Sequence, residues 1–174
     1  MAQSLESVLG NRVCWQILKF FLVNPGGESS EREVQRKVAV ARASARKWLR
    51  VLEQLGFISV TRRGRLKLYK LNREDPVVKQ LKLLNTMGWL IPKLRSLEGR
   101  VEVYLYGSAA RGEELEDSDL DILAIGRERE VINEIGAIDR RIKVSFFTPI
   151  EWAKMAEEDP AFYERVERDR VRLV

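Results

Sequence analysis

The sequence contains no histidine and only one cysteine, Cys14, among its 174 residues. Without histidine there is no Ser-His nucleophile, no histidine ligand for zinc and no imidazole acid or base. A single cysteine cannot form a disulfide within the chain, and Cys14 lies in an apolar stretch, where a small buried side chain is expected. Any catalysis must therefore use carboxylates, lysines, hydroxyls or a metal ion. A reducing, cytoplasmic location is expected.

The sequence also lacks a long hydrophobic run. Lys19 interrupts the first apolar stretch, and no basic segment leads into it. Neither a signal peptide nor a membrane span is therefore expected. Charge is abundant instead: 33% of the residues are charged, 45% are hydrophobic, and the formal net charge is +5.

This net charge conceals an asymmetry along the chain. Residues 1–75 hold 15 Lys and Arg against 7 Asp and Glu, a charge of +8, whereas residues 76–174 hold 16 against 19, a charge of −3. A basic segment suits contacts with phosphates, and the acidic remainder has no such bias. The sequence predicts two domains, residues 1–75 and 98–174, joined by a connecting helix over residues 76–97.

The basic segment has the pattern of three helices followed by a hairpin. Apolar residues at helical spacing over 13–22 predict a first helix. Ser30 and Glu33 have the spacing of a capping box, which predicts the start of a short second helix. A third helix is expected over 42–55, ending at Gly56. Its apolar side alternates with a side that carries four cations.

Two strands, 57–60 and 66–71, are expected to form a hairpin whose connection, 61–65, is rich in arginine. The pattern resembles the winged helix-turn-helix family over about residues 11–72. This resemblance implies a third helix in the major groove of double-stranded DNA and a hairpin that touches the backbone or minor groove. Phosphate contacts would supply most of the affinity, and Arg42 and Lys47 are expected to read guanine edges. The residues assigned to DNA are Arg42, Ser44, Arg46, Lys47 and Arg50 in the helix and Arg62, Arg63 and Arg65 in the hairpin. The alternative is a solvated basic surface on a module for protein contacts.

The connecting helix is expected to start at Asp75-Pro76, an N-cap followed by proline in the first turn. Its apolar residues occur on more than one side, which exceeds what a single domain would bury. A homodimer formed through this helix is therefore expected, with packing between the two domains as the alternative.

The acidic part contains a second motif. A predicted strand over 101–106 leads into Gly107-Ser108, and ten residues separate Ser108 from Asp119. Asp119 and Asp121 flank the first residue of the next strand, so their side chains should point the same way. A glycine lets a phosphate approach backbone amides, and a serine hydroxyl adds a donor. Two carboxylates on one face can bind Mg²⁺ that carries a triphosphate.

This motif resembles the minimal nucleotidyltransferases of the polymerase-beta superfamily, over about residues 98–150. The resemblance implies alternating strands and helices, with a helix over 127–138 and a last strand over 141–147. It also implies Mg²⁺ or Mn²⁺ with an NTP as cofactors. The residues assigned by it are Asp119 and Asp121, as catalytic metal ligands, and Gly107, Ser108 and Arg111, as nucleotide-binding residues.

The last predicted strand departs from that family, whose active members usually carry a third carboxylate there. If the apolar residues of the strand face the core, Lys143 and Ser145 occupy the positions that face the metals. The ammonium of Lys143 could then substitute for a metal ion beside the two aspartates. Asp139 or Glu102 could instead supply the third carboxylate. The sequence leaves these alternatives open.

The expected fold is α/β of the α+β type, with a winged helix-turn-helix, a connecting helix and a small mixed-sheet nucleotidyltransferase-like domain. Two further helices, over 151–158 and 161–169, are expected to cover the sheet, and residues 164–172 are expected to form a solvated face. The missing acid and the DNA module favour a regulator with weak or lost transferase activity. The intact aspartate pair favours an enzyme that transfers a nucleotidyl group to a protein or nucleic-acid hydroxyl. The resemblance adds a third function, an antitoxin that modifies or masks a partner toxin.

Overall fold

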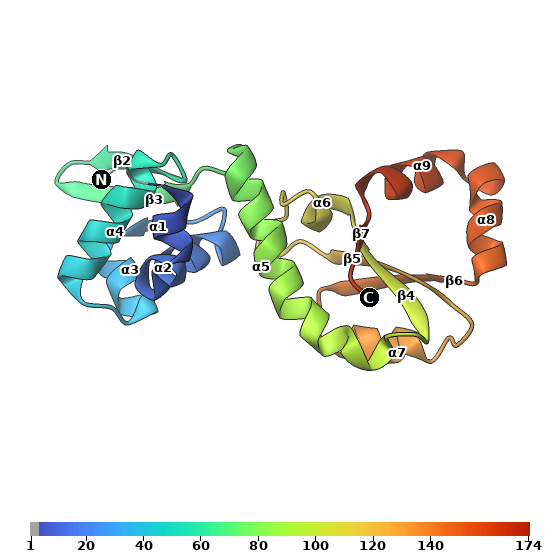
Figure 1. Ribbon diagram of the computed structural model, residues 1–174. Coiled ribbons are helices and arrows are strands. Elements are labelled where there is room, and N and C mark those ends of the chain that lie inside the picture. The colour runs from blue at the N-terminus through green and yellow to red at the C-terminus, as the bar shows by residue number, and fades with distance from the viewer. Residues whose placement is uncertain (1–3) are drawn as a thin grey trace. The chain divides into compact units, whose positions relative to one another are not determined.

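The structure, a computed structural model, describes residues 4–174 and divides into two compact units, Met1–Lys82 and Leu83–Val174. Figure 1 shows the order of helices and strands in each unit. Within residues 4–174, no helix combines the length and the apolarity needed to cross a bilayer.

Two helices of the N-terminal unit start at side-chain caps, of which the sequence predicted the one at Ser30. The amide of Cys14 donates to the side chain of Asn11. Ser30 and Glu33 form the predicted capping box, in which the Glu33 carboxylate accepts from the Ser30 amide at 2.7 Å. Ala39, with φ at +57°, separates the second and third predicted helices. A short helix that was not predicted, α1, precedes the three predicted ones. The four helices are α1 (Leu5–Leu9), α2 (Arg12–Val23), α3 (Glu31–Val38) and α4 (Arg42–Gln54).

The N-terminal sheet has three strands in the order β1-β3-β2, all antiparallel. The predicted hairpin is present, and its second strand has the predicted bounds, but its first strand extends further toward the tip, so that Arg63 pairs with Leu66 and the turn lies at Gly64-Arg65. Gly64 has φ at +60°, a conformation that glycine adopts without strain. The sequence did not predict β1. The strands are β1 (Glu28–Ser30), β2 (Ile58–Arg63) and β3 (Leu66–Leu71).

The core of this unit lies between α2, α4 and the sheet. Ile17 and Leu18 of α2 and Leu49 and Leu52 of α4 are fully buried. Cys14 is buried as expected, and this burial raises the pKa of its thiol to about 12. The thiol therefore stays protonated and packs as a small apolar group.

Helix α5 (Pro76–Leu94) starts at the predicted Asp75 cap and is followed by the short helix η1 (Arg95–Leu97). Its first turns supply Val78 and Leu81 to the core of the N-terminal unit. Its later turns supply Leu90 and Leu94 to the core of the C-terminal unit. The apolar surplus predicted for this helix is thus largely buried, and dimerisation through it stays a prediction.

The C-terminal unit contains a mixed sheet in the order β6-β5-β4-β7. Strand β4 runs antiparallel to β5 and β7, whereas β5 and β6 are parallel. The last strand, β7, was not predicted: Val171 and Arg172 pair with β4, so this end of the expected solvated face belongs to the sheet. The strands are β4 (Val101–Tyr106), β5 (Leu120–Gly126), β6 (Ile142–Phe147) and β7 (Val171–Arg172).

Each face of this sheet has its own apolar cluster. One face packs against α5 and α7. On the other face, Tyr106 and Leu123 pack with Trp152 of α8 and Val166 of α9, so these two helices cover the sheet as predicted. Thr148 caps α8 with a second capping box. The helices of the unit after η1 are α6 (Gly107–Ala110), α7 (Val131–Gly136), α8 (Pro149–Glu158) and α9 (Pro160–Asp169).

Candidate functional site

The two aspartates of the second motif lie at the start of β5. Asp119 directly precedes the strand and is exposed, and Asp121 is its second residue and half-buried. Asp121 pairs in register with Tyr106 at the end of β4 and with Lys143 on β6. The pair therefore lies where β4 ends and α6 begins, beside the Gly107-Ser108 turn.

Gly107 is required at this turn by the position of Asp121. Its φ is +72°, in the left-handed region, and a Cβ at this position would lie only 2.6 Å from Oδ2 of Asp121. A larger residue would therefore be strained and would also push the carboxylate away. The sequence placed Gly107 in the phosphate-binding turn, and the structure adds that this glycine makes room for the Asp121 carboxylate.

The environment of Asp121 disfavours its negative charge. Burial raises the pKa of this carboxyl, the negative charge of Asp119 raises it further, and the positive charge of Arg165 opposes both effects. Arg165 lies on α9, far from Asp121 in the sequence, and no local pattern pointed to it. The two carboxylates together thus form a site that a cation would stabilise.

Strand β6 brings Lys143 and Ser145 to the register positions that the alternation predicted, opposite Asp121 and Leu123. Ser145 shares a hydrogen bond of 3.1 Å with the Tyr106 hydroxyl. Lys143 is exposed, and within the described residues its ammonium makes no ion pair with either aspartate. The contact expected of a lysine that replaces a metal ion is therefore absent, because the side chain extends into solvent instead of lying over the pair.

The other two candidate carboxylates are engaged elsewhere. Asp139 accepts hydrogen bonds from the amide and guanidinium of Arg141, and the guanidinium holds the pKa of Asp139 below its usual value. Glu102 accepts from the Tyr104 hydroxyl at 2.8 Å and lies four positions before Tyr106 on β4. Neither contact directs a third carboxylate to the aspartate pair, and within residues 4–174 no cluster of three or more potential metal ligands occurs.

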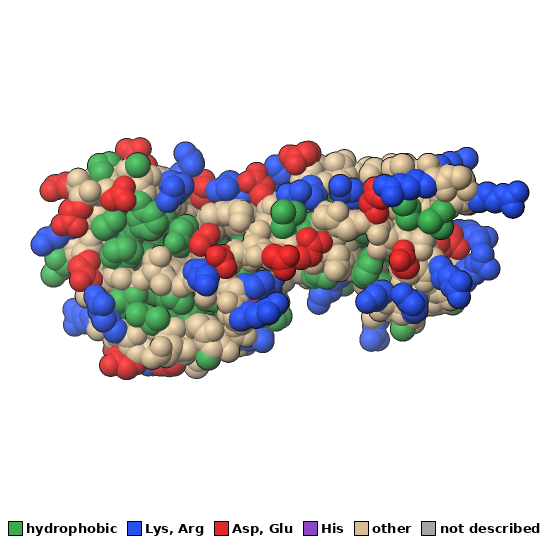
Figure 2. All heavy atoms as spheres, turned by 180° about the vertical axis from the view of Figure 1, so that it is seen from behind, with side chains coloured by type: hydrophobic (Ala, Val, Ile, Leu, Met, Phe, Trp, Pro, Cys, Tyr) green, Lys and Arg blue, Asp and Glu red, His purple; other side chains and the backbone are tan. Residues whose placement is uncertain are grey.

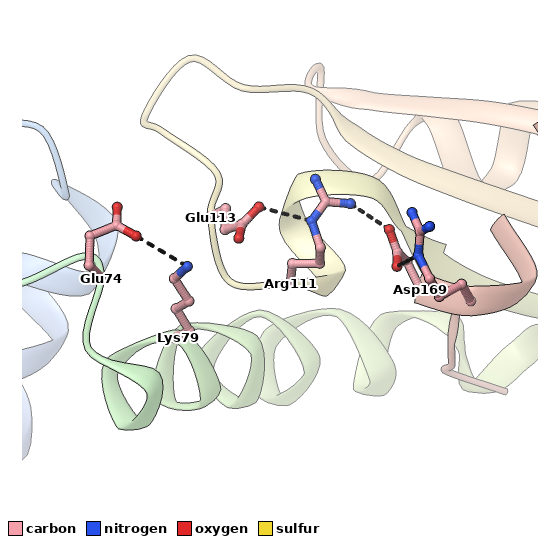
Figure 3. Close-up of polar contacts among 6 residues, drawn as sticks. Glu74, Lys79, Arg111, Glu113 and Asp169 are labelled. Carbon is pink, nitrogen blue, oxygen red and sulfur yellow. Dashed lines mark hydrogen bonds and ion pairs between the residues drawn. The ribbon is translucent and has the colours of Figure 1, made fainter. Parts of the chain in front are cut away.

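Arg111, assigned to the nucleotide, makes two ion pairs (Figure 3). Its Nε lies 2.8 Å from Glu113, and its Nη1 lies 2.6 Å from Asp169 at the end of α9. These pairs connect the segment after α6 to α9. Arg111 would have to exchange a carboxylate for a phosphate to bind a nucleotide, so its assignment stays a prediction. Ser108 follows Gly107 in α6 and is half-buried.

Asp169 provides a test of this connection. Its side chain is only 7% exposed, and hydrogen bonds from Arg168 and then Arg111 lower the pKa of its carboxyl. A lowered pKa stabilises the fold above the unfolded value of about 3.9, and this contribution is lost as the pH falls through the folded value. We expect Asp169→Asn to cost about 1 kcal/mol near neutral pH, because its arginine partners are partly exposed. Urea unfolding near neutral pH measures the cost of the substitution, and unfolding near pH 3 measures the stability that is lost as Asp169 is protonated. Equal stability of Asp169→Asn and the parent chain near neutral pH would show that this ion pair does not stabilise the connection between α9 and the segment after α6.

One family model matches the C-terminal part of the chain. The family model described as the nucleotidyltransferase domain matches residues 87–171. The C-terminal unit is nucleotidyltransferase-like. A solved structure from Sulfolobus solfataricus, provisionally assigned as a nucleotidyltransferase, is 23% identical over 56% of this chain and 84% of its own, with a TM-score of 0.33. No curated protein matches the sequence significantly.

The nucleotidyltransferase-like unit has the donor set for one magnesium ion. Mg²⁺ is usually held by one or two carboxylates, and substrate phosphates and water complete its coordination. Asp119 and Asp121 supply two carboxylates, and the raised pKa of Asp121 marks a charge that a cation would stabilise. The residues present therefore fit one ion brought with a triphosphate.

The N-terminal unit carries the cations assigned to DNA on its surface. Arg42, Arg46, Lys47 and Arg50 are all exposed along one side of α4, and Ser44 is half-buried among them. The three arginines of the hairpin are also exposed. In Figure 2, Lys and Arg side chains cover much of the visible surface of this unit.

A groove of about 660 Å³ lies between α3, α4 and the hairpin. Five cations line it together with one acidic residue, Glu31, which lies 3.2 Å from Arg46 and 3.5 Å from Arg42. A second acid, Glu28, lies 3.0 Å from Arg63 of the hairpin. Sequence reasoning missed both acids, because their contacts depend on the tertiary fold. The cations of the groove are Arg32, Arg42, Arg46, Arg65 and Lys67.

Proposed function

We propose that this protein is a DNA-binding regulator whose nucleotidyltransferase-like unit binds Mg-NTP and has weak or lost transferase activity. One observation carries the DNA part: nine of the fourteen exposed Lys and Arg side chains described in the N-terminal unit lie on α4 and on the hairpin, the two elements that a winged helix-turn-helix presents to DNA. Cations spread over a solvated surface would have no reason to favour these two elements.

On this proposal, α4 lies in the major groove, and Arg42 and Lys47 at its N-terminal part read guanine edges. Arg62, Arg63 and Arg65 bind the backbone or the minor groove, where they supply affinity without sequence preference. The direct test is titration of a labelled duplex with the full chain at increasing salt, because affinity carried by phosphate contacts falls steeply with salt. Binding that does not respond to salt would contradict the proposal.

In the C-terminal unit, Asp119 and Asp121 hold the metal ion, which would polarise the triphosphate that it binds. Gly107 keeps the Asp121 carboxylate against the backbone turn, and Ser108 donates its hydroxyl to a phosphate. Arg165 adds positive charge next to Asp121 and can approach the same phosphates. These residues bind and orient a nucleotide.

Weak or lost transferase activity follows from what β6 presents to this site. A transferase must also activate the attacking hydroxyl, which a carboxylate near the metal can do by accepting its proton. On β6, Lys143 lies opposite Asp121 and Ser145 lies opposite Leu123, so neither position next to the pair holds a carboxylate. Asp139 and Glu102 are hydrogen-bonded elsewhere. Neither of them is directed to the pair, and among residues 4–174 no cluster of three or more potential metal ligands brings a third carboxylate to it.

The alternative is an active Mg-dependent nucleotidyltransferase that modifies a protein or nucleic-acid hydroxyl, a partner toxin included. The close approach of Asp121 to Gly107 favours it, because this left-handed turn leaves room for the carboxylate at the start of α6. Incubation with labelled NTPs, Mg²⁺ or Mn²⁺ and cell extract separates the two: transfer of label to a macromolecule supports the enzyme, and nucleotide binding without transfer supports the regulator.

Gly107→Ala tests the nucleotide site. We expect its affinity for Mg-NTP to fall more than about tenfold, because the new Cβ would meet Oδ2 of Asp121 at 2.6 Å and displace it. Gly99→Ala is the matched control: its φ is +80°, but a Cβ there meets nothing within 4 Å. Both variants should lose about 1 to 2 kcal/mol of stability through the left-handed backbone. Calorimetric titration with each of the four NTPs gives the affinities. Equal nucleotide affinity in the two variants would contradict the site.

A further inference from the structure

We infer that Glu31 and Glu28 are internal competitors for DNA phosphates, which hold three of the DNA-binding arginines and lower the affinity of the chain for any duplex. This inference rests on the proposed DNA-binding function. It adds to that function two acidic residues which limit non-specific binding.

Glu31 contacts two arginines of α4 with the geometry of a bound phosphate. Its Oε1 lies 3.2 Å from Nη2 of Arg46 and its Oε2 lies 3.4 Å from Nε, so that the pair is bidentate. Oε1 also lies 3.5 Å from Nε of Arg42. The planar guanidinium binds carboxylate and phosphate through the same pair of parallel hydrogen bonds. The Glu31 carboxylate therefore uses the donors that a DNA phosphate would use.

Glu28 makes a single contact with an arginine of the hairpin. Strand β1 pairs with β3 and places the Glu28 carboxylate 3.0 Å from Nη2 of Arg63. Glu28 is the first residue of β1 and Glu31 is the first residue of α3, and each contacts an element assigned to DNA. Glu31 thus contacts α4 and Glu28 contacts the hairpin, and the two sets of contacts are independent of each other.

The exposure of the partners shows which side of each pair can move. The side chains of Arg42, Arg46 and Arg63 are 74%, 56% and 69% exposed, whereas Glu31 and Glu28 are 23% and 32% exposed. The carboxylates are held closer to the body of the unit, and the arginines extend from it. Exposed ion pairs are weak, so a phosphate can displace the carboxylate. The acid then remains near the DNA backbone and repels it.

The competition has a measurable signature in the salt dependence of binding. Each phosphate neutralised by a cation adds about 0.9 to the slope of log affinity against log salt. Glu31 holds two arginines and Glu28 holds one. We therefore expect Glu31→Gln to steepen the slope by about 1 to 2 and Glu28→Gln by about 1. At about 0.1 M salt, the affinity should rise roughly tenfold for each additional phosphate contact.

The experiment uses the full chain and a fluorescein-labelled duplex of mixed sequence, with anisotropy titrations between about 50 and 300 mM KCl. Glu53→Gln is the matched control, since Glu53 lies on α4 in the same unit, has the same charge and makes no ion pair with an arginine among the described residues. This control shows how much of any change in affinity comes from the altered net charge alone.

The expected result is a graded series, in which Glu31→Gln binds more tightly than Glu28→Gln, and both bind more tightly than Glu53→Gln. Glu31→Gln that binds no better than Glu53→Gln, while the parent chain binds with a normal salt slope, would overturn the inference and leave the proposed function intact. Weaker binding would overturn it too, since it would mean that Glu31 orients the arginines for DNA. A parent chain and variants that all fail to bind the duplex would overturn the proposed function itself.

Discussion

Asp121→Asn is expected to abolish metal-dependent NTP binding while leaving the fold intact. The residual affinity should be lower by at least about a hundredfold, since the loss of a mere hydrogen-bond partner of a metal ligand already costs roughly 10- to 100-fold. Asparagine has nearly the same shape as aspartate, so the contact with Gly107 is retained. The stability should stay equal or rise, because burial and Asp119 raise the pKa of this carboxyl and its charge is unfavourable in the folded protein.

Asp119→Asn should have the same effect on nucleotide binding. Asp117→Asn is the control, because Asp117 is exposed on the same loop two residues before Asp119. Calorimetric titration with Mg-NTP, repeated with EDTA, separates metal-dependent from metal-independent binding, and thermal unfolding monitors the fold. Metal-dependent binding that survives in both Asp119→Asn and Asp121→Asn would exclude the pair as the site of the ion.

The simultaneous replacement of Arg62, Arg63 and Arg65 by alanine is expected to weaken binding to every duplex. Three lost phosphate contacts would reduce the slope of log affinity against log salt by up to about 2.7, which is roughly a hundredfold in affinity at physiological salt. The expected change is nearer 2 than 3, because Arg63 is partly held by Glu28. On the proposed assignment the hairpin contacts phosphates and not bases, so the loss should not depend on sequence.

A triple replacement by alanine of Arg127, Arg140 and Lys154 is the matched control for this variant. These cations are exposed in the C-terminal unit, so the same charge is removed away from the hairpin. Anisotropy titrations over a range of salt compare the two variants. An unchanged salt slope in the hairpin variant, or an equal loss in both, would remove the hairpin from the DNA interface. Single replacements of Arg42 or Lys47 should instead cost about 1 to 3 kcal/mol on some sequences only.

The sequence predicted the long elements because their signals are local. The capping box at Ser30 marks where α3 begins, and such a cap functions wherever the helix packs. The alternation over 101–106 identified β4, and the motif Asp119-Leu120-Asp121 with the apolar residues after it identified β5. Strands β1 and β7 were missed, since three and two residues are too few to show a period and pair only because β3 and β4 lie beside them.

The residues of the candidate sites also divide into those with a local sequence signal and those whose contacts depend on the tertiary fold. Gly107, Asp119 and Asp121 belong to one short motif, so spacing was enough to predict them together. The parity of β6 correctly placed Lys143 and Ser145 in register beside β5, but parity does not determine where a long side chain extends. Arg165 and Glu31 reach their partners through the packing of separate helices, which no pattern within one segment reports. Predicting them needed the tertiary structure.

The division of α5 between two cores determines where the chain can be cut. A fragment that ends at Asp75 lacks Val78 and Leu81, which are fully or almost fully buried in the N-terminal core. The loss of two such side chains removes roughly 3 to 6 kcal/mol of apolar burial, which is comparable with the whole stability of a small domain. A fragment that ends at Lys82 keeps both. Independent folding of the basic unit therefore depends on the first two turns of α5, although the sequence analysis assigned this whole helix to the connection between the domains.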